Sequence, residues 1–190
     1  MSWSLEEAMK RTGMLKKGHF LLSSGRHSNQ YLQCALLLQY PSDAAETGRQ
    51  LAKLFQDEAI DVVVGPALGG VIIAHEVARA LNVRCLFTER KDGKMQLRRG
   101  FSIKPNERVL IIEDVVTTGG SVREVIDVLN AMQAKIIGIG SIFNRSGKTK
   151  LFGDIPYRAL ETIEIESYLP EECPLCKQGI PAVKPGSRTS

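Results

Sequence analysis

The sequence has no apolar run that approaches the roughly 20 residues a helix needs to span a membrane. Its first residues, Met1 to Glu7, lack the basic stretch and apolar core of a secretory signal peptide. No internal repeat, linker or low-complexity segment divides the 190 residues. We therefore expect a cytoplasmic protein with a single domain over residues 1–190 and no membrane partner.

Charge and cysteine are also in short supply. The formal net charge is only +4, which suits small anionic substrates and does not demand a nucleic-acid partner. Two of the four cysteines, Cys34 and Cys85, lie in apolar contexts and are expected to be core thiols in a reducing compartment. Apolar residues make up 43% of the chain, enough to bury a sizeable core.

The most informative stretch begins with four apolar residues, Val109 to Ile112, which predict a strand buried on both faces. Two adjacent carboxylates, Glu113 and Asp114, end this run. The segment Thr117-Thr118-Gly119-Gly120-Ser121 then leads into a helical pattern from Val122 to Met132. The sequence therefore predicts a strand, a glycine-rich turn and a helix in direct succession.

Such a turn suits a phosphorylated sugar. Hydroxyl groups, backbone N–H groups and a helix N-terminus can converge on one phosphate, and glycine allows a close approach. The carboxylates cannot bind phosphate, but they can accept hydrogen bonds from vicinal hydroxyls or stabilise a cationic centre. The pattern indicates a site for a ribose 5-phosphate; the alternative is a solvated strand–turn–helix without a ligand.

This segment resembles the phosphoribosyl-pyrophosphate (PRPP) motif of the type I phosphoribosyltransferases: four apolar residues, two acids, two apolar residues, then Thr-x-Gly-x-Ser/Thr. The resemblance implies that Glu113 and Asp114 are catalytic and hold the ribose hydroxyls. It places further PRPP contacts at Val115, Val116, Thr117, Thr118, Gly119, Gly120 and Ser121. It also implies Mg²⁺ as a cofactor, held mainly by substrate oxygens and water, with no side chain assigned as its ligand.

A second unit of the same kind precedes the motif. Asp61 to Val64 predicts a strand, Gly65 to Gly70 a glycine-rich loop, and Val71 to Leu81 a helix. The bare N–H groups of this loop suit an anion, although glycine-rich turns of this type are common. In the family the corresponding loop holds the pyrophosphate. The resemblance therefore implies possible ligand contacts at Ala67, Leu68 and Gly69.

Two more segments resemble the orotate phosphoribosyltransferases within this family. Phe20 to Tyr31 has the pattern of their N-terminal hood, with His27 as a possible ligand contact where the best-known bacterial members have Lys. Residues 88–100 form a predicted polar, basic loop that resembles their flexible catalytic loop. The matching cations are Arg90, Lys91 and Lys94, which would close over pyrophosphate and exclude water, with Lys94 catalytic. A homodimer is implied, with this loop contributing to the neighbouring site.

Arg145 follows a predicted strand, Lys135 to Phe143, so it would lie at the mouth of an α/β sheet, where ligands bind. Its guanidinium group can bind a carboxylate with two parallel hydrogen bonds, although a surface Arg is the simpler alternative. The resemblance implies that Arg145 and Thr117 hold orotate.

The C-terminal segment contains Cys173-Pro174-Leu175-Cys176, half of a four-ligand zinc site. A complete site needs a partner subunit or a histidine brought close by folding. A redox pair and a purely structural tail are the alternatives.

We therefore predict an α/β fold, a mostly parallel twisted sheet flanked by helices, with a hood at about 1–40, a core at about 41–165 and a tail at about 166–190. The resemblance implies transfer of phosphoribose from PRPP to orotate in UMP biosynthesis. A purine-type phosphoribosyltransferase and a non-enzymatic PRPP-sensing regulator that binds nucleic acid are the alternatives.

Overall fold

The computed structural model describes residues 3–22 and 24–185 and divides the chain into two compact units. One unit comprises Leu38–Ile163, and we call it the sheet unit. The other combines Met1–Leu37 with Glu164–Ser190, and we call it the hood unit. The last part of the predicted tail, residues 186–190, lies outside the described residues.

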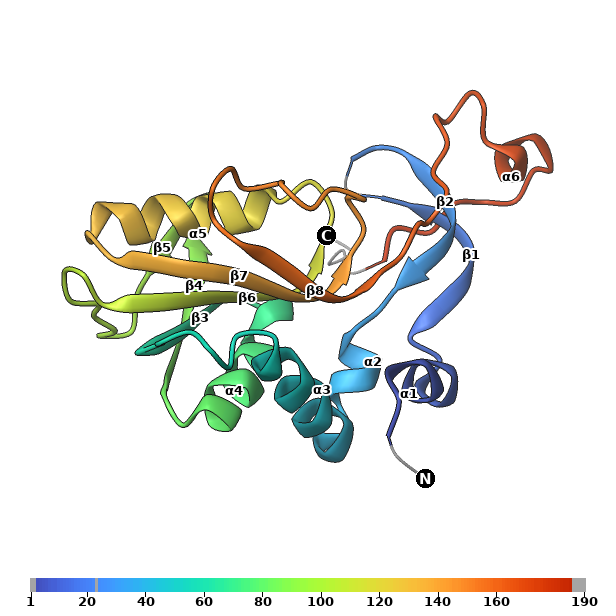
Figure 1. Cartoon of the computed structure of the whole chain (residues 1–190). Helices are drawn as coiled ribbons and strands as arrows, with labels where there is room; N and C mark the ends of the chain where they lie inside the picture. The colour runs from blue at the N-terminus through green and yellow to red at the C-terminus, as the bar shows by residue number, and fades with distance from the viewer. Residues whose placement is uncertain (1–2, 23, 186–190) are drawn as a thin grey trace. The chain divides into compact units, whose positions relative to one another are not determined.

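The sheet unit contains six strands in the order β5-β4-β3-β6-β7-β8, shown in Figure 1. All neighbouring strands are parallel except β4 and β5. The strands are β3 (Val62–Pro66), β4 (Arg84–Lys91), β5 (Lys94–Leu97), β6 (Arg108–Val116), β7 (Lys135–Asn144) and β8 (Tyr157–Thr162). The predicted mostly parallel α/β sheet is confirmed.

Helices cover both faces of this sheet. Figure 1 shows α3 (Pro41–Lys53) and α4 (Gly69–Leu81) on one face and α5 (Gly120–Ala131) on the other. The apolar segments of the two central strands are fully buried, since the side chains of Val62 to Val64 and of Val109 to Ile112 are 0% exposed. Burial of each such aliphatic side chain stabilises the fold by about 1.5–3 kcal/mol. This is why the central strands read as continuous apolar runs in the sequence.

The predicted polar loop at residues 88–100 is wrong in its secondary structure. β4 continues to Lys91 and pairs antiparallel with β5, so Lys91 lies opposite Lys94. The turn between them is Asp92-Gly93, both with positive φ (53° and 77°). Asp-Gly between two extended segments is a strong hairpin signal, because both residues tolerate the left-handed conformation that a tight hairpin turn requires.

The hood unit contains a two-stranded antiparallel sheet of β1 (Leu15–Leu21) and β2 (His27–Leu32). Helix α1 (Leu5–Thr12) precedes it and is capped by Ser4, whose Oγ accepts a hydrogen bond from the Glu7 N–H at 3.1 Å. The C-terminal segment, with the short helix α6 (Pro174–Lys177), bonds to this hairpin through isolated bridges to Phe20 and His27. A further short helix, α2 (Ala35–Leu38), precedes α3.

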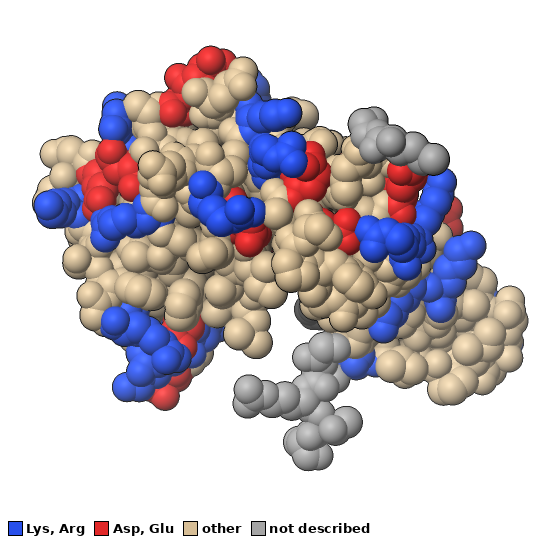
Figure 2. All heavy atoms as spheres, turned by 90° about the horizontal axis from the view of Figure 1, so that it is seen from below, with Lys and Arg blue, Asp and Glu red and all other residues tan. Residues whose placement is uncertain are grey.

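Charged side chains of both signs are distributed over the surface. On the face drawn in Figure 2, Lys and Arg lie among Asp and Glu, and the coloured residues form no single broad basic area. Among the described residues, no helix is long and apolar enough to cross a membrane.

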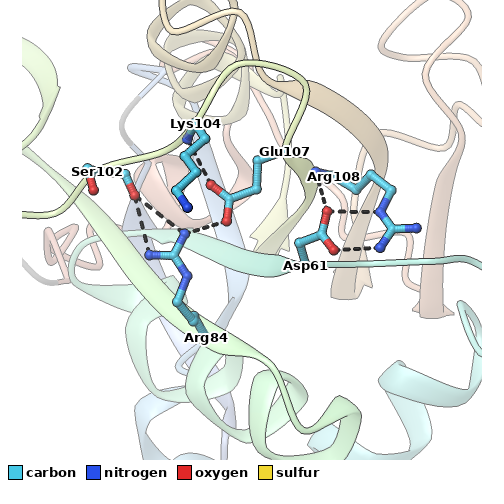
Figure 3. Close-up of polar contacts among 6 residues, drawn as sticks. All are labelled: Asp61, Arg84, Ser102, Lys104, Glu107 and Arg108. Carbon is cyan, nitrogen blue, oxygen red and sulfur yellow. Dashed lines mark hydrogen bonds and ion pairs between the residues drawn. The ribbon is translucent and has the colours of Figure 1, made fainter.

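Ion pairs join the strands at the edge where β3, β4 and β6 begin (Figure 3). Arg108 donates to both Asp61 carboxylate oxygens at 2.8 and 2.5 Å, and its backbone N–H also donates to Asp61. Arg84 pairs with Glu107 at 2.5 Å. Because these residues lie where the strands begin, their ion pairs link β3, β4 and β6 at the edge of the sheet opposite the C-terminal ends of the strands.

We expect Asp61→Asn to lower the thermal midpoint at pH 7 by roughly a few degrees. The Arg108 guanidinium holds the pKa of Asp61 well below its ordinary value, so this stabilisation is present above about pH 4 and is lost as pH falls further. Thermal melts of wild type and variant should therefore differ at pH 7 and approach each other in acid. Asp57→Asn, an exposed neighbour, is the matched control. Equal midpoints for wild type and Asp61→Asn at pH 7 would contradict the role of this pair.

Candidate active site

The candidate site lies where the strand order of the sheet reverses. From β3 the chain continues outward to β4 on one side, whereas β6, β7 and β8 follow one another on the other side. β3 and β6 are adjacent and parallel, so the loops that follow them lie at the same edge. In open α/β sheets this switch point is where ligands bind. The two glycine-rich turns of the sequence are thus brought together.

The carboxylates of Glu113 and Asp114 stand at the C-terminal end of β6. Glu113 is only 8% exposed, and its Oε1 accepts a hydrogen bond from the Asp114 N–H at 3.0 Å. Asp114 Oδ1 accepts one from the Val115 N–H at 2.8 Å. Burial raises the pKa of both carboxyls, and the charge of Asp114 raises that of Glu113 further. Burial therefore disfavours the charged form of the pair in the free protein, and a cationic centre or hydroxyl donors would stabilise that form.

The loop after β3 touches these carboxylates. A Cβ on Gly69 would lie 2.7 Å from Asp114 Oδ2, and one on Gly70 would lie 3.1 Å from Glu113 Oε1. Any side chain at position 69 would displace Asp114, because real Cβ contacts are never this short. The Ala67–Leu68 peptide bond is cis, and the Leu68 side chain is 85% exposed. Of the predicted contacts Ala67, Leu68 and Gly69, Gly69 lies beside the acid pair, and the other two precede it in the same loop.

The predicted phosphate loop connects β6 to α5. Thr117 and Thr118 are exposed, and α5 begins at Gly120, so its free N–H groups face the end of this loop. Arg123 donates to the Thr118 carbonyl at 2.6 Å and to the Leu151 carbonyl at 2.8 Å. Sequence reasoning missed this positioning role of Arg123. The only signal for it was a cation in the first turn of a helix, where the helix dipole disfavours positive charge.

Arg145 is placed beside the phosphate loop. Val116 on β6 pairs with Asn144 on β7, and the Arg145 N–H donates to the Val116 carbonyl at 2.8 Å. Thr117 and Arg145 are therefore the next residues along two adjacent parallel strands. The Asn144 side chain accepts hydrogen bonds from the Ser146 N–H and hydroxyl at 2.9 and 2.7 Å, which shapes the turn that carries Arg145.

The basic hairpin of β4 and β5 divides its cations into two groups. Arg90 forms a two-pronged ion pair with Glu124 of α5, at 2.7 and 3.1 Å, and Arg98 and Arg99 pair with Glu89. Glu124 also raises the pKa of Arg90. Lys91 and Lys94 are exposed and form no ion pair with any other described residue. Sequence reasoning did not foresee the Glu124 partner, since 34 residues separate the two side chains.

In the hood unit, His27 contacts other residues of the same unit. Its Nδ1 lies 2.8 Å from His19 Nε2 and 3.2 Å from Cys176 Sγ. The neighbouring donors are also engaged: Arg26 donates to the Ser167 hydroxyl and carbonyl, and Ser28 donates to the Glu166 carbonyl at 2.8 Å.

The fold agrees with comparisons to known proteins. Residues 37–169 match the family model described as "Phosphoribosyl transferase domain", and this range contains the six-stranded sheet, Glu113 and Asp114, and the two glycine-rich loops. The orotate phosphoribosyltransferase of Thermoanaerobacter sp. (strain X514) is 52% identical over 183 residues, which cover 96% of this chain and 95% of that relative. The chain belongs to the orotate phosphoribosyltransferase family.

Solved structures show the same fold. The orotate phosphoribosyltransferase from Aeropyrum pernix is 24% identical with a TM-score of 0.68, over 84% of this chain and 94% of that one. The adenine phosphoribosyltransferase from Thermoanaerobacter pseudethanolicus ATCC 33223 is 14% identical with a TM-score of 0.70, over 84% and 100%. Because proteins named for different bases share the fold, the fold alone does not identify the base.

Proposed function

We propose that this enzyme transfers the 5-phosphoribosyl group from PRPP to orotate, giving orotidine 5′-monophosphate and pyrophosphate in de novo UMP biosynthesis. The observation that carries the proposal is the 52% identity to a relative of that name over nearly the whole chain. The convergence of the acid pair and the two anion-binding loops at one edge of the sheet supports it. A cytoplasmic location stays a prediction from the sequence.

The acid pair would act on the ribose. Glu113 and Asp114 accept hydrogen bonds from its two hydroxyls, and their negative charge favours the cationic, oxocarbenium-like ribose of the transition state. The N–H groups and hydroxyls of residues 117–121 bind the 5-phosphate at the start of α5. The loop at 67–69 offers backbone N–H groups to the pyrophosphate. Orotate N1 then attacks C1 of the ribose as the bond to pyrophosphate breaks. The pyrophosphate leaves with the bonding electrons and takes up the proton that N1 loses.

The donor set at the site fits Mg²⁺, because Glu113 and Asp114 offer the hard carboxylate oxygens that this ion prefers. We propose that pyrophosphate oxygens, ribose oxygens and water supply most of its ligands. When bound, the ion neutralises charge on the leaving pyrophosphate. When the basic hairpin closes over the site, Lys91 and Lys94 would add positive charge beside the pyrophosphate. Closure would also exclude water, which could otherwise attack C1 of the cationic ribose.

Arg145→Ala should raise the KM for orotate roughly 10- to 150-fold, the loss expected when a charge-assisted hydrogen bond to a carboxylate is removed. The KM for PRPP should change little, because Arg145 follows β7 rather than one of the two phosphate-binding turns. Steady-state kinetics with each substrate varied in turn measure the difference. Arg158→Ala, which removes an Arg of β8 bonded to Leu54 and Glu58, is the matched control. Equal weakening of both substrates by Arg145→Ala would overturn its assignment to orotate.

The proposal is tested by following orotate consumption through its ultraviolet absorbance with PRPP and Mg²⁺, beside adenine, hypoxanthine and uracil. Loss of orotate alone, dependent on PRPP, is the expected result. Turnover of another base would support the PRPP site but show that orotate is not the substrate. Binding of PRPP without turnover of any base would favour the alternative of a non-enzymatic regulator that senses PRPP.

A further inference from the structure

Four metal-binding side chains that play no part in the proposed reaction converge in the hood unit. They are His19 of β1, His27 of β2, and Cys173 and Cys176 at α6. One ligand atom from each residue, His19 Nε2, His27 Nδ1 and the two Sγ atoms, lies within 4.8 Å of all the others. These residues are up to 157 positions apart in the sequence, so the fold supplies the second pair of ligands that the Cys-x-x-Cys segment lacks.

We propose that these residues form a Zn²⁺ site of two cysteines and two histidines. A tetrahedral Zn²⁺ ion has bonds of about 2.0 Å to nitrogen and about 2.3 Å to sulfur, so its ligand atoms lie roughly 3.3–3.8 Å apart. His19 Nε2 lies 3.4 Å from Cys173 Sγ and 3.8 Å from Cys176 Sγ. The separations of His27 Nδ1 from Cys176 Sγ, 3.2 Å, and from His19 Nε2, 2.8 Å, need to widen by only a few tenths of an ångström.

The surroundings of His19 fix its ring for this role. Its Nδ1 lies 2.6 Å from the Ile180 carbonyl, which can only accept a hydrogen bond, so Nδ1 carries the proton. Neutral His19 therefore presents the lone pair of Nε2 to the other three ligand atoms. A ligating histidine typically donates its second N–H to a carbonyl or carboxylate in this way.

Backbone structure also aims the ligands. The β1–β2 register shifts between Lys17 and Phe20, so His19 lies at a β-bulge, and the adjacent residues His19 and Phe20 are both buried. Without the bulge, neighbouring side chains would point to opposite faces of the hairpin. Cys173 is the N-cap of α6 and Cys176 lies within its single turn, in which the Lys177 N–H donates to the Cys173 carbonyl at 3.2 Å. Both pairs are thus held by local structure.

Charge and access fit a closed structural site. Binding of Zn²⁺ to two thiols releases two protons, and the resulting complex of one dication, two thiolates and two neutral imidazoles carries no net charge. Neutrality matters because His19 is only 4% exposed and Cys173 is 0% exposed. Four protein ligands leave no open position for a substrate, so the ion would fasten the C-terminal segment to the hairpin rather than catalyse a reaction. A hollow of about 370 Å³, lined in part by His19, Leu175 and Ile180, lies beside one of the four ligands.

The proposal is tested first by the metal content of the wild-type protein, purified without added metal or chelator and measured by plasma mass spectrometry. We expect about one zinc per chain. Cys176→Ser should lose it, whereas Cys85→Ala, which removes the partly buried cysteine of β4, should keep it. Cys176 is exposed, so its substitution leaves the core of the hood unit intact.

A second measurement does not depend on the variants. Zinc-depleted wild-type protein titrated with Co²⁺ should give the absorption bands of a tetrahedral, thiolate-bound ion at one equivalent. Hydrogen exchange should then slow in residues 15–32 and 166–183 and stay unchanged in β3 and β6. The proposal would be overturned if purified wild type held no zinc and gave no such absorption bands with Co²⁺. A disulfide between Cys173 and Cys176 in the purified protein would also overturn it, as would an equal loss of zinc in Cys85→Ala.

Discussion

Asp114→Asn is expected to lower turnover by about 10²- to 10³-fold and, at the same time, to raise the thermal midpoint. Turnover falls because the amide cannot supply the negative charge that favours a cationic ribose. The Asn side chain keeps the shape of Asp and an oxygen that can still accept the Val115 N–H, now at 2.8 Å from Asp114 Oδ1. The local backbone should therefore be unchanged.

Stability should rise because burial disfavours the ionised carboxyl. The folded-state pKa of Asp114 is raised, so its ionisation destabilises the fold above the ordinary Asp pKa of about 4, and this penalty disappears at lower pH. Asp114→Asn removes the penalty, and we expect a gain of roughly 0.5–2 kcal/mol in the free energy of unfolding at pH 7. Melting curves at pH 7 and pH 4 measure both the gain and its loss in acid.

Asp127→Asn, on the exposed face of α5, controls for the loss of one carboxylate from the protein. It should change neither turnover nor the pH dependence of stability. Wild-type turnover in Asp114→Asn would remove Asp114 from the mechanism. A lowered thermal midpoint would instead show that the carboxylate serves the fold, and the loss of activity would then need another cause.

The sequence predicts the sheet well because its central strands are buried on both faces. The segments Val62 to Val64 and Val109 to Ile112 contain only apolar residues, and such short apolar runs predict buried strands. The acids and glycines that follow them indicate where each strand ends. Since parallel strands end at the same edge, the meeting of the 67–70 loop with Glu113 and Asp114 follows from local patterns. Contacts between loops at the ends of neighbouring parallel strands can therefore be predicted from the sequence.

Pairings between distant segments are not accessible in the same way. The Arg90–Glu124 pair and the carbonyls that Arg123 binds depend on how α5 lies against the sheet. His19 and Cys173, 154 positions apart, are brought together by a bulge in one segment and a helical turn in another. No rule of residue spacing predicts that such residues meet, because their contact depends on how distant segments pack together.

The β4–β5 hairpin is a different case. Its Asp92-Gly93 turn is a local sequence pattern and could have been predicted.

Lys94→Ala should lower turnover by roughly a hundredfold or more with an unchanged thermal midpoint. Lys94 is exposed and lies at the tip of the hairpin opposite Lys91, so its side chain contributes little packing. Its ammonium group would act only when the hairpin closes over pyrophosphate. Lys104→Ala, another exposed lysine near the opposite edge of the sheet, should keep wild-type turnover (Figure 3). A lowered thermal midpoint in Lys94→Ala would contradict the proposal that Lys94 acts only when the hairpin closes over pyrophosphate.

We propose that the protein is a homodimer in which the hairpin of one subunit reaches the site of the other, and this arrangement can be tested directly. Each subunit with Lys94→Ala retains Asp114, and each with Asp114→Asn retains Lys94. When the two variants are unfolded, mixed in equal amounts and refolded, half of the dimers are hybrids, and one site in each hybrid combines both wild-type groups. The mixture should therefore recover about a quarter of wild-type turnover, since the closed two-subunit symmetry pairs every site with its neighbour. If Lys94 acts within its own subunit, no hybrid site holds both groups, and the mixture stays as inactive as its parents.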